Sequence, residues 1–264
     1  MKSKLSIPLA LLGASALTAS AVTVTVLPGD LTWGSTGNSG GGSSAITGTA
    51  PRSGNGSLEL FGDRTRFIGL GDPYSSTSNL GLLSSLTNFT FDWMVAVGSA
   101  GTGPGAAASY SPALRLHIWD GTQRSELIWE NAYNGNTSAV QGSWYSTGFG
   151  DNYYRYQAAA PVGASSGETA GLGIMDWFAP ILPSLGTGYS ANAYISAVSI
   201  GVGSSAGAGY HAFADNLTLS FGANNTTTYN FEATGGSVPD GGTTLVLLGG
   251  ALTGLGALRR KFRK

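Results

Sequence analysis

The segment Phe89-Thr90-Phe91-Asp92-Trp93-Met94-Val95-Ala96-Val97 has the clearest two-residue periodicity in the chain. Large apolar side chains occupy every odd position, and smaller or polar side chains occupy most of the even positions. Because successive side chains of a strand point to opposite faces, this alternation predicts a half-buried β-strand whose odd positions, Val97 included, face the core.

Short apolar segments of the same kind recur along the chain, separated by clusters of Gly, Ser, Thr and Asn. Further strands are predicted at Ser57–Phe61, Arg66–Ile68, Ala113–Trp119, Ser125–Asn131, Tyr194–Val202, Phe213–Phe221 and Thr228–Glu232. Glycine accounts for 42 of 264 residues, more than twice the usual share of about 7%, and it has no Gly-X-Y period.

The strand spacing decides the fold class. Ala113–Trp119 and Ser125–Asn131 predict a β-hairpin, and Phe213, Leu217 and Leu219 are expected on one face of a late strand. The one convincing helical segment is short, Ile174–Phe178. We therefore predict an all-β, two-sheet β-sandwich of the jelly-roll or concanavalin-like type.

The two ends of the chain have the composition of targeting segments. Residues 1–21 combine Lys2 and Lys4, an apolar stretch and the small-residue site Ala19-Ser20-Ala21, which predicts a cleaved signal peptide. At the other end, residues 243–258 are uncharged and predict a short transmembrane helix of roughly 24 Å. Five basic residues then predict a cytoplasmic end: Arg259, Arg260, Lys261, Arg263 and Lys264.

Residues 238–264 resemble the PEP-CTERM sorting signals of bacterial envelope proteins. The order is a Pro-containing motif, a membrane segment and a basic cluster, and the closest variant carries Val-Pro-Asp-Ser-Gly. Here the motif reads Val238, Pro239, Asp240, Gly241 and Gly242, with Gly241 in place of the Ser. The resemblance implies export by the translocon, membrane anchoring and cleavage near the motif by an exosortase.

Between these ends, residues 22–237 form one predicted domain. It holds six arginines, no lysine and thirteen acidic residues, a net charge of about −7, and the whole chain has no cysteine. An acidic, lysine-free domain is poorly suited to a phosphate backbone, so we expect no nucleic-acid partner. The domain is long enough to be stabilised by a hydrophobic core rather than by disulfides.

The sequence offers no convincing set of catalytic residues. Glu126 and Glu130 would lie roughly 13 Å apart on one strand, too far for either glycosidase mechanism, although a pair such as Asp92 and Glu126 across strands stays open. We expect these acids to be solvated. The two histidines, His117 and His211, accompany no Gly-x-Ser-x-Gly motif, so we expect no enzymatic activity.

The strongest candidate for binding is the aromatic segment 142–156, for which we expect a loop. Tyr and Trp rings stack on the C–H faces of sugars, and an arginine can donate to their hydroxyls. The candidate sugar-binding residues are Trp144, Tyr145, Tyr153, Tyr154, Arg155 and Tyr156. The alternative is that these rings close the open end of the sandwich.

Asp215 interrupts an otherwise apolar strand. A buried carboxylate needs a partner, so Asp215 is either a structural Ca²⁺ ligand, with Asp30 or Glu59, or a turn or bulge carboxylate bonded to backbone N–H groups. Asp215-Asn216-Leu217-Thr218-Leu219 is also similar to the closing strand of jelly-roll, carbohydrate-binding-like domains. No other cofactor is expected.

Together these features predict an exosortase-sorted protein of the cell envelope or extracellular matrix. Its expected role is structural or associated with exopolysaccharide. A carbohydrate-binding module is the first alternative, and a glycoside hydrolase is the second.

Overall fold

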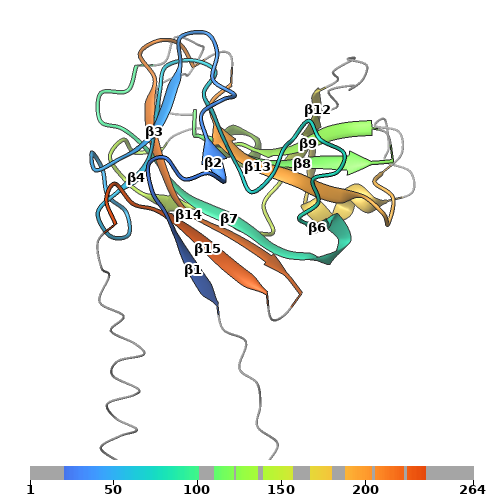
Figure 1. The fold of residues 1–264 in the computed structure, drawn as a ribbon. Helices are drawn as coiled ribbons and strands as arrows, with labels where there is room; N and C mark the ends of the chain where they lie inside the picture. Colours follow the sequence, from blue (N-terminus) through green and yellow to red (C-terminus); the bar gives the residue numbers. More distant parts are fainter. Residues whose placement is uncertain are drawn as a thin grey trace, which may run out of the picture.

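The strand predicted around Phe91 is β7, Leu86–Val95, in the computed structural model (Figure 1). Its side chains at 89, 91, 93 and 95 are all buried in the main core, as the alternation predicts. Val97 is the exception, because β7 ends at Val95 and the chain turns through Gly98, whose φ is +80°. Val97 is therefore 80% exposed, and the prediction that it faces the core is wrong.

The structure describes residues 21–100, 110–121, 123–135, 139–156, 167–179, 188–203, 206–222 and 225–235. The predicted signal peptide (1–21) lies almost wholly outside this part, and the predicted sorting signal (238–264) lies entirely outside it. Within the described residues no helix has the length and apolar character needed to cross a membrane.

The described residues form two β-sheets that pack as a sandwich. Sheet A contains β1 (Val22–Val26), β3 (Ser43–Thr47), β4 (Ser57–Phe61), β7, β10 (Tyr145–Ser146), β14 (His211–Phe221) and β15 (Thr226–Phe231). Sheet B contains β2 (Trp33–Gly34), β5 (Arg66–Gly69), β6 (Gly81–Leu82), β8 (Ala113–Asp120), β9 (Gln123–Trp129), β11 (Tyr153–Tyr156), β12 (Gly167–Leu172) and β13 (Tyr194–Gly201). The 3₁₀ helices are η1 (Leu83–Ser85), η2 (Asn131–Asn134) and η3 (Ile174–Phe178).

Strand order follows from which segments pair. In sheet A, β14 lies between β7 on one side and both β4 and β15 on the other. In sheet B the order is β12-β11-β9-β8-β13-β5-β2. Figure 1 shows β7, β14, β15 and β1 in one layer and β13, β8 and β9 in the other. The all-β sandwich is confirmed.

The predicted hairpin is β8 and β9, paired from Leu114 opposite Trp129 to Asp120 opposite Gln123. Leu114, Leu116 and Ile118 enter the core between the sheets. The alternate positions of β8 lie on the other face of sheet B, which we call the outer face. They are also buried there, Arg115 and His117 included.

β14 departs from its predicted pattern. Ala212, Ala214, Leu217 and Leu219 all belong to the main core, whereas Phe213 packs in a separate cluster on the outside of sheet A. The pairing with β7 shifts register between 215 and 218, at a β-bulge where Asn216 has a φ of +50°. The bulge exchanges the faces of the strand, so the prediction that Phe213 shares a face with Leu217 is wrong.

Segment 142–156, for which we expected a loop, contains two strands. β10 pairs with β7 at one edge of sheet A. β11 pairs with β9 in sheet B, with Tyr154 opposite Ile128 and Tyr156 opposite Glu126. The aromatic residues of this one segment are thereby divided between the two sheets.

Candidate functional site

A groove crosses the outer face of sheet B. It has a volume of about 570 Å³, and the strands beneath it, from β11 through β9, β8 and β13 to β5, are adjacent in the sheet. Its walls and floor are lined by Gly37, Ser39, Arg64, Thr65, Arg66, Arg115, Glu126, Ile128, Tyr154, Tyr156, Val202 and Gly203. We call it the sheet B groove.

One wall of the groove is a loop fastened to β5. The backbone N–H of Arg66 donates to Asn38 Oδ1 at 2.7 Å, and that of Ser39 donates to the Arg64 carbonyl at 3.0 Å. Gly37 passes so close to Arg66 that a Cβ there would lie 2.9 Å from its side-chain carbons. A glycine at position 37 thus lets the loop pack along the Arg66 side chain.

Glu126 lies at the centre of the groove floor, where it is 1% exposed, so the prediction that it is solvated is wrong. Arg66 donates to it from Nη1 at 3.3 Å and Nη2 at 3.5 Å. Nδ1 of His117 lies 3.4 Å from its Oε1, and Nη1 of Arg124 lies 3.6 Å from the same oxygen. Burial acts to raise the pKa of Glu126, but His117 and the arginines outweigh it and hold that pKa well below its usual range.

Arg115 has fewer partners in the groove floor than Glu126 has. Arg115 is 4% exposed, and its closest described carboxylate is Glu126, with Nε 3.8 Å from Oε2. Among the described residues, Nε and Nη1 of Arg115 have no hydrogen-bond partner. Burial, and then the charge of Arg66, lower the pKa of Arg115. Its positive charge at the groove is therefore incompletely compensated.

The alternation of β11 brings two of the predicted sugar-binding residues into the groove. Tyr154 and Tyr156 line it, and the Tyr154 hydroxyl donates to Glu130 Oε1 at 3.1 Å. Tyr153 and Arg155 point the other way. Tyr153 is fully buried in the core, and the Arg155 guanidinium lies 5.1 Å from the centroid of the buried Trp177 ring.

The other two predicted sugar-binding residues lie away from the groove. Tyr145 stacks on Trp93, with ring centroids 4.8 Å apart. Trp144 packs against the outer cluster of sheet A, under the guanidinium of Arg52. The structure therefore brings together two of the six candidates, joined by arginines from β5 and β8 that we did not select.

The predicted sorting signal is the part of the chain with a known counterpart. Residues 237–262 match the family model described as the VPDSG-CTERM motif.

The chain carries a PEP-CTERM-type sorting signal.

This sorting signal implies export, membrane anchoring before processing and processing by an exosortase, with the protein ending outside the cell or on its surface. The match covers the tail alone, so it concerns the destination of the protein and not the chemistry of the groove. No curated protein matches the chain, and no solved structure matches it.

The exported domain also contains a chain of groups in the order of a hydrolase triad. Nε2 of His117 lies 2.9 Å from Ser199 Oγ, and Nδ1 faces Glu126. Ser199 and His117 are fully buried, however, and neither lines the groove. In this arrangement the Ser199 hydroxyl is shielded from any substrate carbonyl in the groove, which a nucleophile would have to reach. Sequence reasoning missed it because its members lie up to 82 residues apart.

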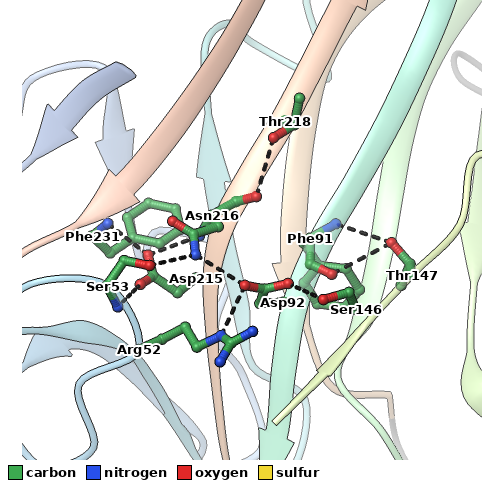
Figure 2. A network of polar contacts seen from close by, with 10 residues as sticks. All are labelled: Arg52, Ser53, Phe91, Asp92, Ser146, Thr147, Asp215, Asn216, Thr218 and Phe231. Carbon is green, nitrogen blue, oxygen red and sulfur yellow. Dashed lines mark hydrogen bonds and ion pairs between the residues drawn. The ribbon is translucent and has the colours of Figure 1, made fainter. Parts of the chain in front are cut away.

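Asp215 lies at the β-bulge of β14, on the opposite sheet (Figure 2). Its Oδ1 accepts from the backbone N–H groups of Asn216 at 2.8 Å and Phe231 at 2.9 Å, and its Oδ2 accepts from that of Ser53 at 3.2 Å. This is the bulge arrangement that we had set beside the Ca²⁺ alternative. Glu59 bonds instead to Thr47, Thr49 and His211.

A second carboxylate supports the same bulge. Asp92 faces Asp215 across the β7–β14 pair, where its Oδ2 accepts from Arg52 Nε at 3.0 Å and from the Asn216 amide at 2.9 Å (Figure 2). Within the described residues, no group of three or more His, Cys, Asp or Glu side chains is arranged to hold a metal ion. The Ca²⁺ assignment of Asp215 stays a prediction.

Proposed function

We propose that the exported domain binds polysaccharide of the cell envelope or extracellular matrix through the sheet B groove. The observation that carries this proposal is the alternation of β11, which aims Tyr154 and Tyr156 into a groove also lined by arginines. The sorting signal supports it independently, because it implies that the domain works at or beyond the cell surface.

The groove has the size and chemistry that a sugar requires. Its volume of about 570 Å³ falls within the range of roughly 300–1,000 Å³ that is usual for small-ligand sites. Tyrosine rings offer flat apolar faces with few rotatable bonds, and guanidinium groups offer several donors to hydroxyl oxygens. The groove is open rather than enclosed in the protein interior, which suits one segment of a long polymer.

The proposal includes no catalytic step. Glu126 is bound by arginines in the groove floor. Glu130, whose pKa is raised by burial, lies four residues further along, roughly 13 Å away if the strand geometry continues. Glycoside hydrolysis needs two carboxyl groups about 5–9.5 Å apart. We therefore expect the protein to retain a polysaccharide without shortening it.

Affinity electrophoresis of the full chain in detergent, through gels containing single polysaccharides, tests this proposal. We expect retardation by at least one polymer, and a loss of affinity of about tenfold in Tyr156→Ala because a stacking face is removed. Trp144→Ala is the matched control, since it removes an aromatic ring from the outside of sheet A. Equal losses in both variants, or no retardation by any polymer, would contradict the assignment to the groove.

A further inference from the structure

Four of the six arginines of the exported domain gather on the outer face of sheet B, although the domain has a net charge of about −7. Arg64, Arg66 and Arg115 line the groove, and Arg124 lies behind them against Glu126. They come from three strands and one loop, and only the fold brings them together. A cationic cluster in an acidic domain indicates that this face recognises negative charge.

The charges at the groove do not balance among the described residues. Arg66, Arg115 and Arg124 all approach the one carboxylate of Glu126. Burial lowers the pKa of His117, although the neighbouring Glu126 acts to raise it. Arg64 is more exposed and has its own carboxylate, Asp63, with Nε 3.4 Å from Oδ2. The Glu126 site thus holds more guanidinium groups than carboxylates.

Arg115 marks where a further anion would lie. A buried charged group needs hydrogen-bond partners, yet Nε and Nη1 of this guanidinium have none among the residues described. Glu126 is the nearest carboxylate in the described part of the chain, and 3.8 Å is too long for a hydrogen bond. Arg115 belongs to the groove lining, so a ligand oxygen entering the groove can supply the missing acceptor.

The tyrosines narrow the chemical class of the anion. A bare inorganic ion would gain no stacking contact from the rings of Tyr154 and Tyr156, which line the groove together with the arginines. A sugar ring that carries a carboxylate would use both kinds of group, its C–H face on a ring and its carboxylate on a guanidinium. Arginine suits this task because its planar donors match the two oxygens of a carboxylate.

We propose that the sheet B groove selects acidic saccharide units, that is, sugars carrying a ring carboxylate, with Arg115 and Arg66 receiving the carboxylate. This rests on the proposed polysaccharide function and adds the identity of the preferred sugar class. It predicts that binding to an acidic polymer weakens as salt is added, because exposed charge attraction is screened. Binding to a neutral polymer would lack this dependence.

A matched pair of polymers tests the inference: polygalacturonate, and the same polymer after reduction of its carboxyl groups to alcohols. With the full chain in detergent, we expect polygalacturonate to bind at least about tenfold more tightly than the reduced polymer. Arg66→Gln should remove most of this preference, because it should weaken the binding of polygalacturonate far more than the binding of the reduced polymer. Arg115→Lys, which keeps the charge but loses the planar fork, should reduce the preference without abolishing it.

Two controls separate the proposals. Arg52→Gln removes an arginine from the opposite sheet and should leave the preference intact, which excludes an effect of overall charge. Acetate at the same carboxylate concentration should not displace the polymer; complete displacement would assign the groove to small anions and overturn the sugar class. Equal binding of the two polymers would overturn this inference alone. Binding of neither, and of no other polysaccharide, would overturn the proposed function as well.

Discussion

Oε1 of Glu126 lies 3.4 Å from Nδ1 of His117, and both side chains are buried on the outer face of sheet B. The same carboxylate accepts from Arg66 and has Arg115 and Arg124 within ion-pair distance. One acidic group therefore holds together side chains from β5, β8 and β9. Glu126 therefore supplies the negative charge around which the arginines of the groove floor gather.

Glu126→Gln should strongly destabilise the domain at neutral pH. Removing one partner of a buried ion pair leaves uncompensated charge, which costs about 3–5 kcal/mol in the free energy of unfolding. The matched control is Glu59→Gln, in the partly exposed Glu59–His211 pair, for which we expect about 1 kcal/mol or less. Urea denaturation of both variants measures the difference, and equal losses would show that the Glu126 cluster is not a structural centre.

The acid stability of the domain should depend on the same carboxylate. The folded-state pKa of Glu126 lies well below its unfolded value of about 4.3, so the stabilisation is complete above that value. It is lost as the pH falls from about 5 towards the folded-state pKa, since the unfolded chain takes up the proton first. The free energy of unfolding should therefore fall more steeply below pH 5 in the native protein than in Glu126→Gln, and parallel curves would contradict this.

Asp215 should give the opposite pH dependence. Burial raises the pKa of Asp215 to about 7, even though three backbone N–H groups act to lower it. Its unfolded value is about 3.9, so the folded state keeps the proton longer, and this stabilisation is present below pH 4 and lost as the pH rises towards 7. Asp215→Asn cannot titrate. The free energy of unfolding of Asp215→Asn, relative to that of the native protein, should therefore rise by roughly 1.4 kcal/mol for each pH unit as the pH rises from about 4 to 7.

The comparison needs a control at the same bulge. Asp92→Asn removes the carboxylate that faces Asp215, but it leaves the three backbone donors of Asp215 in place. Denaturation of the three proteins at pH 4, 5.5 and 7.5 separates the effects. A stability difference between Asp215→Asn and the native protein that stays constant across these values would contradict the raised pKa.

The periodicity of the sequence was sufficient for β7, β8 and β9, because each places its alternate apolar side chains in the core between the two sheets. It failed on β14, where a bulge at Asn216 exchanges the faces, since no period of two carries across an inserted residue. The groove was only partly foreseeable. Tyr154 and Tyr156 stood out as aromatic residues, but Arg66 meets Glu126 across 60 residues of sequence, and only strand order creates that contact.

Chelation distinguishes the two roles considered for Asp215. Both of its oxygens accept backbone N–H groups, whose positive ends face the carboxylate and oppose a cation at the same place. We therefore expect the melting temperature to be unchanged when Ca²⁺ is removed with EGTA and then added back. A Ca²⁺-dependent increase that is absent in Asp215→Asn would instead assign Asp215 to a calcium site.

The native protein should lose both ends of its chain. The predicted signal peptide precedes Val22, and the sorting signal at 237–262 implies cleavage by an exosortase near Val238 to Gly242. Intact-mass measurement of protein recovered from the surface of its own host should therefore give a chain that begins at Val22 and lacks 245–264. Pro239→Ala, which alters the motif but neither the apolar segment nor the basic cluster, should keep the tail and stay in the membrane fraction. A native protein that still carries residues 245–264 would mean that the sorting signal acts as a permanent anchor.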